Sequence, residues 1–376
     1  MREDFEPAAG PRGVRRPAPM AVVAIPARDE ASCVPACLHA LAIQEDAAGR
    51  AIGTGTFAVL LLANNCRDGT AAVARAMAPS LPYPLIVREA ELPPGRSHAG
   101  GARRAAMDAA AALLDTHAPG AVILSTDADG LPEPGWLQAN LSALAAGADA
   151  VAGSIRPDPA QWSALPQALR EREAREARYA TLLDEIAARL DPDPHDPWPR
   201  HGIHSGASIA LTLGAYRRVG GLPEVPVGED RALFLALLRA DMRVRHLPDA
   251  RVTVSCRLDG RAAGGMADTM RSRLREEDAA PTDPRLEPAR DAFRRFRRRR
   301  ALRRLRAGRG DPRLLARALG LSTEVLASIA ARPGFWRAWE ELEAAAPALR
   351  RRSVAAGALN AEAARAAALL SALRAA

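Results

Sequence analysis

One stretch of the sequence constrains the fold more than any other: the apolar run 121–126 leads directly into Asp127-Ala128-Asp129-Gly130. The run predicts a buried strand, and Gly130 predicts a tight turn after it. Ligands of open α/β sheets bind at the carboxyl ends of the strands, so both aspartates are expected at the mouth of a crevice. Two carboxylates there suit Mg²⁺ or Mn²⁺, although an Asp after a strand also serves as an ordinary turn or cap residue.

The first 130 residues repeat this arrangement of an apolar strand followed by a helix. Strands are predicted at 20–25, 57–62, 83–88 and 121–126, with helices at 27–41, 71–77 and 102–114 between them. Alternation of this kind predicts an α/β fold with a mostly parallel sheet flanked by helices. Further strands are predicted at 148–155, 206–211, 243–247 and 251–255, and further helices at 134–146, 164–190, 214–219 and 231–240. No Gly-x-Gly-x-x-Gly follows the first strand and no Walker loop occurs, which argues against those nucleotide-binding classes.

Length and composition place the chain among globular proteins. Its 376 residues are enough for one large domain or two modest ones. No segment approaches the roughly 18 apolar residues that span a bilayer, and the polar N-terminus lacks a signal-peptide core. The four cysteines have no zinc or Cys-x-x-Cys spacing, so they indicate a reducing compartment and a cytoplasmic location.

The positive charge is concentrated in one window. The chain contains no lysine, and ten arginines lie between 294 and 309 without an acid, so the rest of the chain is slightly acidic despite the net charge of +8. Three interpretations of this window stay open: a helix packed on the catalytic region, peripheral membrane contact through 293–309 at the inner face, or a nucleic-acid patch. The first is favoured and the last is disfavoured. Phe293, Phe296, Leu302 and Leu305 form a rough apolar stripe under the cluster.

The chain is expected to divide into three parts. Residues 1–19 form a flexible arm, 20–270 a catalytic domain with halves 20–130 and 131–270, and 271–376 an Arg- and Ala-rich helical region. Within the last part, 311–376 predicts two or three amphipathic helices. Their small core is expected from Leu314, Leu315, Leu319, Leu321, Leu326, Phe335 and Trp336.

Several short motifs, weak alone, occur in an order that resembles the family 2 glycosyltransferases. They are Ile25-Pro26-Ala27-Arg28-Asp29-Glu30, Ala63-Asn64-Asn65-Cys66-Arg67-Asp68-Gly69-Thr70, Ala102-Arg103, Asp127-Ala128-Asp129, Val219-Gly220-Gly221 and Gly228-Glu229-Asp230. The resemblance covers roughly residues 20–260. It implies a GT-A fold and the metal-dependent, inverting transfer of a sugar from a nucleotide-sugar donor, most simply a UDP-sugar, to a hydroxyl acceptor that is a small molecule or lipid-linked. The Gln-x-x-Arg-Trp signature of processive synthases is missing, which argues against polymer synthesis.

The resemblance also assigns roles to individual residues. Donor-binding roles fall on Pro26, Ala27, Arg28, Glu30, Asn64, Arg103, Asp127 and Ala128. Asp129 and Asp127 would hold Mg²⁺ or Mn²⁺, with His246 as a further ligand. Asp230 would be the general base, with Glu229 beside it, although both also suit the start of a helix.

Two features depart from the family pattern or extend it. Asn64 stands where many relatives have an aspartate that pairs with uracil, and Asn65 where they have glycine, so the base of the donor is left open. Contacts to the acceptor or the diphosphate are expected from the residues His204, Gly206, Arg257 and Arg261. The proline-broken loop 191–199 would border the acceptor site. Two other functions remain as alternatives: a sugar-phosphate nucleotidyltransferase on a similar sheet, and a nucleic-acid-binding protein acting through the arginine window.

Overall fold

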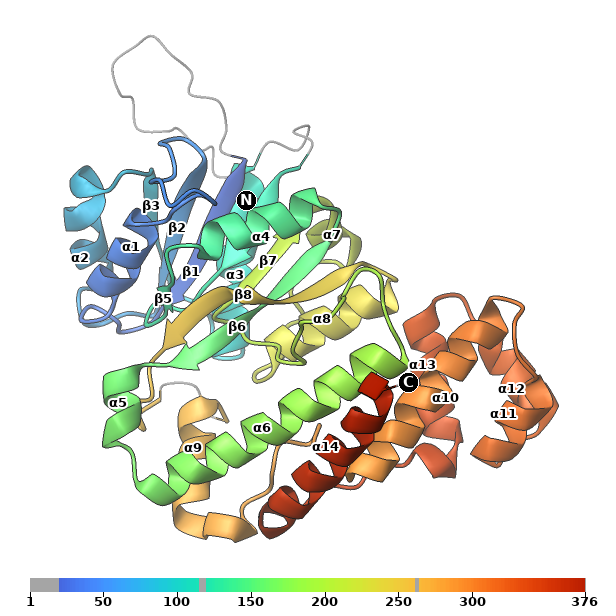
Figure 1. Ribbon diagram of the computed structural model, residues 1–376. Helices are drawn as coiled ribbons and strands as arrows, with labels where there is room; N and C mark the ends of the chain where they lie inside the picture. Colours follow the sequence, from blue (N-terminus) through green and yellow to red (C-terminus); the bar gives the residue numbers. More distant parts are fainter. Residues whose placement is uncertain (1–19, 115–119, 261–263, 376) are drawn as a thin grey trace.

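The computed structural model describes residues 20–114, 120–260 and 264–375 (Figure 1). The apolar runs of the first half form four parallel strands. They are β1 (Ala21–Ala27), β2 (Phe57–Asn64), β3 (Leu85–Ala90) and β4 (Val122–Ser125), in the order β3-β2-β1-β4. Every residue of β2 and β4 is buried, as expected for central strands covered on both faces.

The second half extends the same sheet to eight strands in the order β3-β2-β1-β4-β7-β6-β8-β5. The added strands are β5 (Leu131–Pro132), β6 (Ala150–Pro157), β7 (Ile209–Thr212) and β8 (Val244–Val254). β7 runs antiparallel to β4 and β6, whereas β6 and β8 are parallel. The expectation of two short strands at 243–247 and 251–255 was wrong: they form one strand, with a register shift against β6 between Gly153 and Ser154.

Helices cover both faces of the sheet, and β1 contributes alternate residues to each side. Val23 and Ile25 pack in the core under α1 (Val34–Ala42), α2 (Thr70–Met77) and α4 (Trp136–Ala145). Val22 and Ala24 pack in the core under α3 (Ala99–Leu113), α7 (Leu213–Arg218) and α8 (Glu229–Arg239). The chain therefore has the α/β architecture predicted for it, a mostly parallel sheet between helical layers.

The remaining helices lie beside one edge of this sandwich (Figure 1). They are α5 (Pro159–Ala164), α6 (Gln167–Leu190), α9 (Met266–Glu276), α10 (Ala289–Arg306), α11 (Pro312–Leu319), α12 (Thr323–Ala330), α13 (Phe335–Ala345) and α14 (Leu359–Ala375). α6 packs against α10 and α14 through a shared apolar core that contains Tyr179, Leu183 and Ile186. α6 precedes residue 270 in the sequence but shares its core with helices that follow it.

The C-terminal region contains more helices than expected. Four α-helices, not two or three, occupy 311–375. Gly320, with a φ of 69°, ends α11, and Gly334, with a φ of 83°, precedes α13. A second core contains Leu315, Leu319 and Leu326, with Leu321, Phe335 and Trp336 at its margin, as expected. Leu314 was wrongly placed in that core, since it is 68% exposed.

The arginine window forms two faces of α10. On the inner face Arg295 pairs with Glu287 at 2.7 Å, and Arg299 and Arg303 both pair with Asp191, at 2.5 and 3.0 Å. Arg294, Arg297, Arg300 and Arg304 lie on the exposed face. Arg299 and Arg303 thus fasten α10 to the residue that follows α6, and Arg295 joins α10 to the segment before it and to α13, which fits the packed-helix interpretation. Within the described ranges, no helix has the length and apolar composition needed to cross a membrane.

Candidate active site

The polar segments that follow β1, β2 and β4 meet at one edge of the sheet, because these strands are parallel neighbours. Ala27, at the end of β1, pairs with Ala63, and Ala24 pairs with Ser125 of β4. The segments are tied together: the Glu30 backbone N–H donates to the Thr70 hydroxyl at 2.9 Å. This edge therefore holds Pro26 to Glu30, Asn64 and Asp127 to Asp129.

Arg103, on α3, connects four separate segments at this edge. Its guanidinium donates to Asp127 Oδ1 at 2.6 Å, Glu229 Oε1 at 3.0 Å, the Gly206 carbonyl at 2.9 Å and Ser125 Oγ at 3.1 Å. The side chain is 6% exposed. Burial lowers the pKa of Arg103, but Asp127 and Glu229 outweigh it and raise the pKa, so the group stays charged.

Gly206 is required beside Arg103. A Cβ at this position would lie 2.4 Å from the guanidinium, which is closer than side-chain atoms approach. The sequence interpretation proposed Gly206 as a ligand contact. In the structure its backbone carbonyl accepts from Arg103, and its N–H donates to Asp230 Oδ2 at 2.9 Å.

Glu229 and Asp230 begin α8 but have different surroundings. Glu229 is buried and held by Arg103, whereas Asp230 accepts only backbone N–H groups, from Gly206 at 2.9 Å and Arg231 at 2.6 Å. Burial and the charge of Glu229 raise the pKa of Asp230. Of the two carboxylates, Asp230 is therefore the better proton acceptor, since no guanidinium occupies it in the described part of the chain.

Arg257, which follows β8, bridges two carboxylates of the same edge. Its guanidinium lies 2.5 Å from Glu30 Oε1 and 3.1 Å from Asp129 Oδ2. Burial and the nearby charge of Asp127 raise the pKa of Asp129 to about 6, although Arg257 opposes this. Asp129 thus lies in a negative environment that one guanidinium only partly neutralises. Arg261, predicted beside it, lies outside the described residues.

The turn after β2 explains the departure at Asn65. Asn65 has a φ of 50°, in the left-handed region that favours glycine, and Asn is among the side chains that tolerate it. Its amide donates to the Leu92 carbonyl at 3.0 Å. Asn64 is buried, and its Oδ1 makes no hydrogen bond with the described residues, which leaves an acceptor open at the predicted base position.

A second acidic group lies between the same two turns. Asp29, Cys66 and Asp68 are the one set of described side chains whose three potential ligand atoms lie within 4.8 Å of one another. Each already has backbone partners: Asp29 accepts from Arg67 N–H at 2.7 Å, and Asp68 accepts from Thr70 N–H at 3.0 Å. These bonds give the cluster a structural role in holding the two turns.

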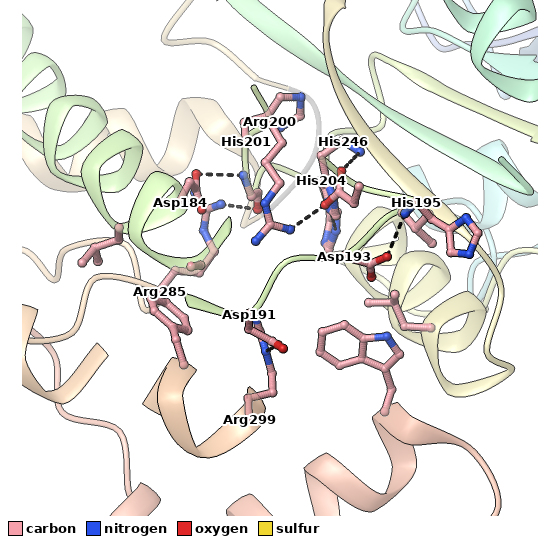
Figure 2. Close-up of a pocket in the computed structure, with 18 of the residues that line it drawn as sticks. Asp184, Asp191, Asp193, His195, Arg200, His201, His204, His246, Arg285 and Arg299 are labelled. Atoms are coloured by element: carbon pink, nitrogen blue, oxygen red, sulfur yellow. Dashed lines mark hydrogen bonds and ion pairs between the residues drawn. The ribbon is translucent and has the colours of Figure 1, made fainter. Parts of the chain in front are cut away.

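The structure places His246 away from the aspartates. Its Nδ1 contacts Asp196 Oδ2 at 2.9 Å and its Nε2 contacts His204 Nε2 at 3.0 Å. Within the described ranges Asp127, Asp129 and His246 do not form a three-ligand group. His246 and His204 instead line a cavity of about 670 Å³ (Figure 2). The prediction of His246 as a metal ligand beside Asp129 therefore finds no geometric support.

Several polar residues of this cavity were not found from the sequence. Asp184, Arg285 and Trp336 line it together with Asp196, but they come from α6, the segment before α10, and α13. Of the lining, only the proline-broken loop 191–199 and His204 were predicted to lie near an acceptor. Nothing in the sequence connects residues so far apart along the chain.

Arg28 and Ala128, also predicted to bind the donor, make fewer polar contacts than Arg103 and Arg257. Arg28 is exposed and donates to the Ser97 carbonyl at 2.8 Å, which ties the turn after β1 to the loop before α3. Ala128 is buried in the core under α1. Arg28 and Ala128 thus lie at the edge where the donor was expected.

Comparison with known proteins gives one family match. Residues 22–195 match the family model described as Glycosyl transferase family 2, a range that includes Asp127 and Asp129 but not Asp230. No curated protein sequence matches the chain. Among solved structures it is similar to the mannosyltransferase PcManGT from Pyrobaculum calidifontis in complex with GDP-Man and Mn²⁺, at 19% identity over 95% of this chain and 80% of that chain, with a TM-score of 0.41. It is also similar to S. aureus TarS 1–349 in complex with UDP-GlcNAc, at 16% identity over 92% and 88%, with a TM-score of 0.45.

Proposed function

We propose that this chain transfers a sugar from a nucleotide-sugar donor to a hydroxyl group, with inversion at the anomeric carbon. The premise is the match of residues 22–195 to the glycosyl transferase family 2 model. The observation that carries the proposal is the Arg103 network. One buried guanidinium contacts Asp127, on the proposed donor side, and Glu229 and Gly206, which position Asp230 on the proposed acceptor side. The two sides of the reaction thus share one fixed group.

Asp127 and Asp129 are the residues proposed to hold Mg²⁺ or Mn²⁺. The fit rests on donor chemistry: two oxygen ligands, one of them with a pKa raised by burial and by its neighbour, favour a hard cation. When bound, the ion would neutralise the negative charge that develops on the departing diphosphate. Arg257 provides part of that positive charge at Asp129 in the ligand-free protein, and it would turn to the diphosphate when the donor enters.

Asp230 is proposed to accept the proton of the acceptor hydroxyl. The hydroxyl oxygen forms a bond to the anomeric carbon as the bond to the diphosphate oxygen breaks, and the hydroxyl proton passes to Asp230. A base positioned in this way contributes typically about 10²–10⁴-fold to the rate. The backbone N–H groups of Gly206 and Arg231 orient the carboxylate for this step.

The nucleoside is proposed to bind at Pro26, Ala27, Arg28, Glu30 and Asn64, with Ala128 beside it. The open Oδ1 of buried Asn64 would accept from an N–H of the base, because an unpaired buried acceptor costs about 1–3 kcal/mol. A UDP-sugar remains the first expectation, and the base remains a prediction.

The test separates donor binding from turnover. Asp230→Asn should keep donor affinity and lower kcat at least about a hundredfold, because the amide cannot accept the proton. Asp129→Asn should instead abolish the stabilisation that UDP-, GDP-, TDP- or CDP-sugars produce with Mn²⁺ in a thermal-shift assay. Full activity of Asp230→Asn would remove Asp230 from the mechanism. Donor binding that is the same with and without Mn²⁺ would contradict the proposed metal site.

A further inference from the structure

The cavity that contains His204 and His246 lies between the sheet and the C-terminal helices (Figure 2). Its walls come from α6, the loop 191–204, the start of β8, α10 and α13. Its volume of about 670 Å³ is in the range of small-molecule sites. None of the residues proposed to bind the donor lines it.

The register of the sheet relates His246, in the cavity wall, to the carboxyl end of β4, which leads to Asp127 and Asp129. His246 pairs with Ala152 of β6, which pairs with Ile209 of β7, which pairs with Ser125 of β4. His246 is thus level with the carboxyl end of β4 and three strands away, about 14 Å at the usual strand spacing of ~4.8 Å.

A second contact joins the cavity to α8. The ring of His204 stacks on Phe234 with 4.7 Å between centroids. Phe234 lies four residues, about one helical turn, after Asp230. The segment between His204 and Gly206 then leads directly to the N–H that holds Asp230. His204 is therefore the lining residue that connects the cavity, through Phe234 and Gly206, to the segment around Asp230.

The charges around the cavity cancel. Six arginines and six carboxylates line it. The arginines are already engaged, Arg299 and Arg303 with Asp191 and Arg200 with Asp196 at 2.6 Å. A phosphate or carboxylate ligand would have to compete with these pairs. The lining therefore does not favour an anion.

Two histidines of the cavity, His201 and His204, are uncharged near neutral pH. Burial and the neighbouring His246 lower the pKa of His201 to about 4 and that of His204 to about 2. His204 is therefore too weak a base to serve in catalysis. With Asp196, the histidines do not provide three ligand atoms within metal-binding distance. Neutral imidazoles offer one hydrogen-bond donor and one acceptor each.

Open hydrogen-bonding groups and flat apolar surfaces remain. Nδ1 of His201 accepts from the Ile203 N–H at 3.1 Å, so the proton lies on Nε2. That nitrogen is buried and makes no hydrogen bond of good geometry with the described residues, and the Leu247 backbone raises the pKa of the ring. A ligand reaches this nitrogen only if the side chains that cover it move. Trp336 and Phe296 also line the cavity, and the Arg299 guanidinium lies over one face of each ring, 5.5 and 5.4 Å from the centroids. Aromatic rings beside donors and acceptors suit the C–H faces and hydroxyl edges of a sugar ring.

We propose that this cavity binds the acceptor, and that the acceptor is a neutral polyhydroxylated molecule, a sugar or a glycoside, whose reacting hydroxyl extends past His204 to Asp230. This inference rests on the transferase function proposed above and adds the acceptor class. It assigns to α10 and α13 the outer wall of the acceptor site.

The experiment compares three acceptor panels at millimolar concentration with the full chain, Mn²⁺ and a donor that the thermal-shift assay has identified. The panels are neutral methyl glycosides, their 6-phosphates, and simple alkyl alcohols. Transfer to at least one methyl glycoside, at a kcat/KM at least about tenfold above its 6-phosphate and the alcohols, is expected. Preference for the phosphates or the alcohols, or no transfer to any neutral glycoside while the donor is hydrolysed, would overturn the proposal. Failure to bind any donor would instead contradict the transferase function.

Three variants localise the site. His201→Asn retains an acceptor for the Ile203 N–H but loses the Nε2 donor, Trp336→Phe reduces the aromatic surface, and Ala180→Phe enters the cavity from the half-buried face of α6. Each should raise the acceptor KM about tenfold and leave donor KM and donor hydrolysis unchanged. Trp162→Phe, at a tryptophan of α5 that packs in a separate apolar cluster outside the cavity lining, is the control. Unchanged acceptor KM in all three folded variants would place the acceptor elsewhere.

Discussion

Two regions differ in their balance of charge: the edge of the sheet where the segments after β1, β2 and β4 meet, and the cavity lined by His204 and His246. At the edge, Glu30, Asp127, Asp129, Glu229 and Asp230 outnumber the two guanidinium groups, Arg103 and Arg257, that contact them. In the cavity, arginines and carboxylates balance and two histidines are neutral. The edge therefore has an excess of negative charge, which favours the binding of a cation together with a nucleoside diphosphate. The cavity has no such excess, which suits a neutral ligand.

The largest effect is expected from the central group of the edge. Arg103→Met leaves Glu229 and Asp127 without their partner, and breaking a buried pair in this way costs about 3–5 kcal/mol. Urea unfolding followed by circular dichroism measures the loss. Arg75→Met is the control, because the Arg75–Glu89 pair is exposed and should be worth less than about 1 kcal/mol. Equal losses in the two variants would mean that Arg103 is no more important than a surface residue.

The cavity should be recognised by its pH dependence. His201 stays neutral in the folded protein down to about pH 4, whereas the unfolded chain takes up that proton near pH 6.5. The unfolded state binds more protons between these values, so the free energy of unfolding falls as pH drops from about 6.5 to 4, by about 3 kcal/mol for this group.

His201→Asn removes that contribution. The difference in unfolding free energy between the parent and His201→Asn should be constant above pH 7 and shift in favour of the variant between pH 6.5 and 4. A difference that does not change with pH would show that His201 is charged or solvated in the folded protein, and the contrast between the two regions would fail.

The smallest effect concerns Arg257, which is 31% exposed, compared with 6% for Arg103. Arg257→Gln should change stability by less than about 1 kcal/mol and tighten Mn²⁺ binding in the absence of donor about tenfold, because a competing positive charge leaves Asp129. Titration calorimetry with Mn²⁺ alone measures this. Weaker Mn²⁺ binding would mean that Arg257 does not occupy the cation position.

The sequence predicted those parts of the molecule whose signals are local. The buried runs, the helices between them and the turn residues after β1, β2 and β4 follow from patterns a few residues long. The same patterns failed where pairing with a distant strand determines the extent of an element. In β8, pairing with β6 joins two predicted strands into one.

The site shows the same division. Asp127, Glu229 and Arg103 could be named from motifs, but the contacts that join them depend on the packing of α3 and α8 on one face of the sheet. His246 was predicted beside Asp129 because it follows the helix that starts at Glu229. Two strands, β7 and β6, lie between the strand that leads to Asp129 and the strand that carries His246, and strand order cannot be read from any short motif. The roles of these residues, the division of the chain at 270 and membrane contact through 293–309 stay predictions.

The shared core of α6 limits how this protein can be dissected. Cutting the chain after β8 would strip the cover from Tyr179, Leu183 and Ile186, and such uncovered apolar faces make fragments aggregate. Measurements on a shortened chain would therefore describe a misfolded or aggregated protein. Exchanging the C-terminal helices together with the matching α6 keeps this core covered, and is the safer way to test the acceptor role proposed for these helices.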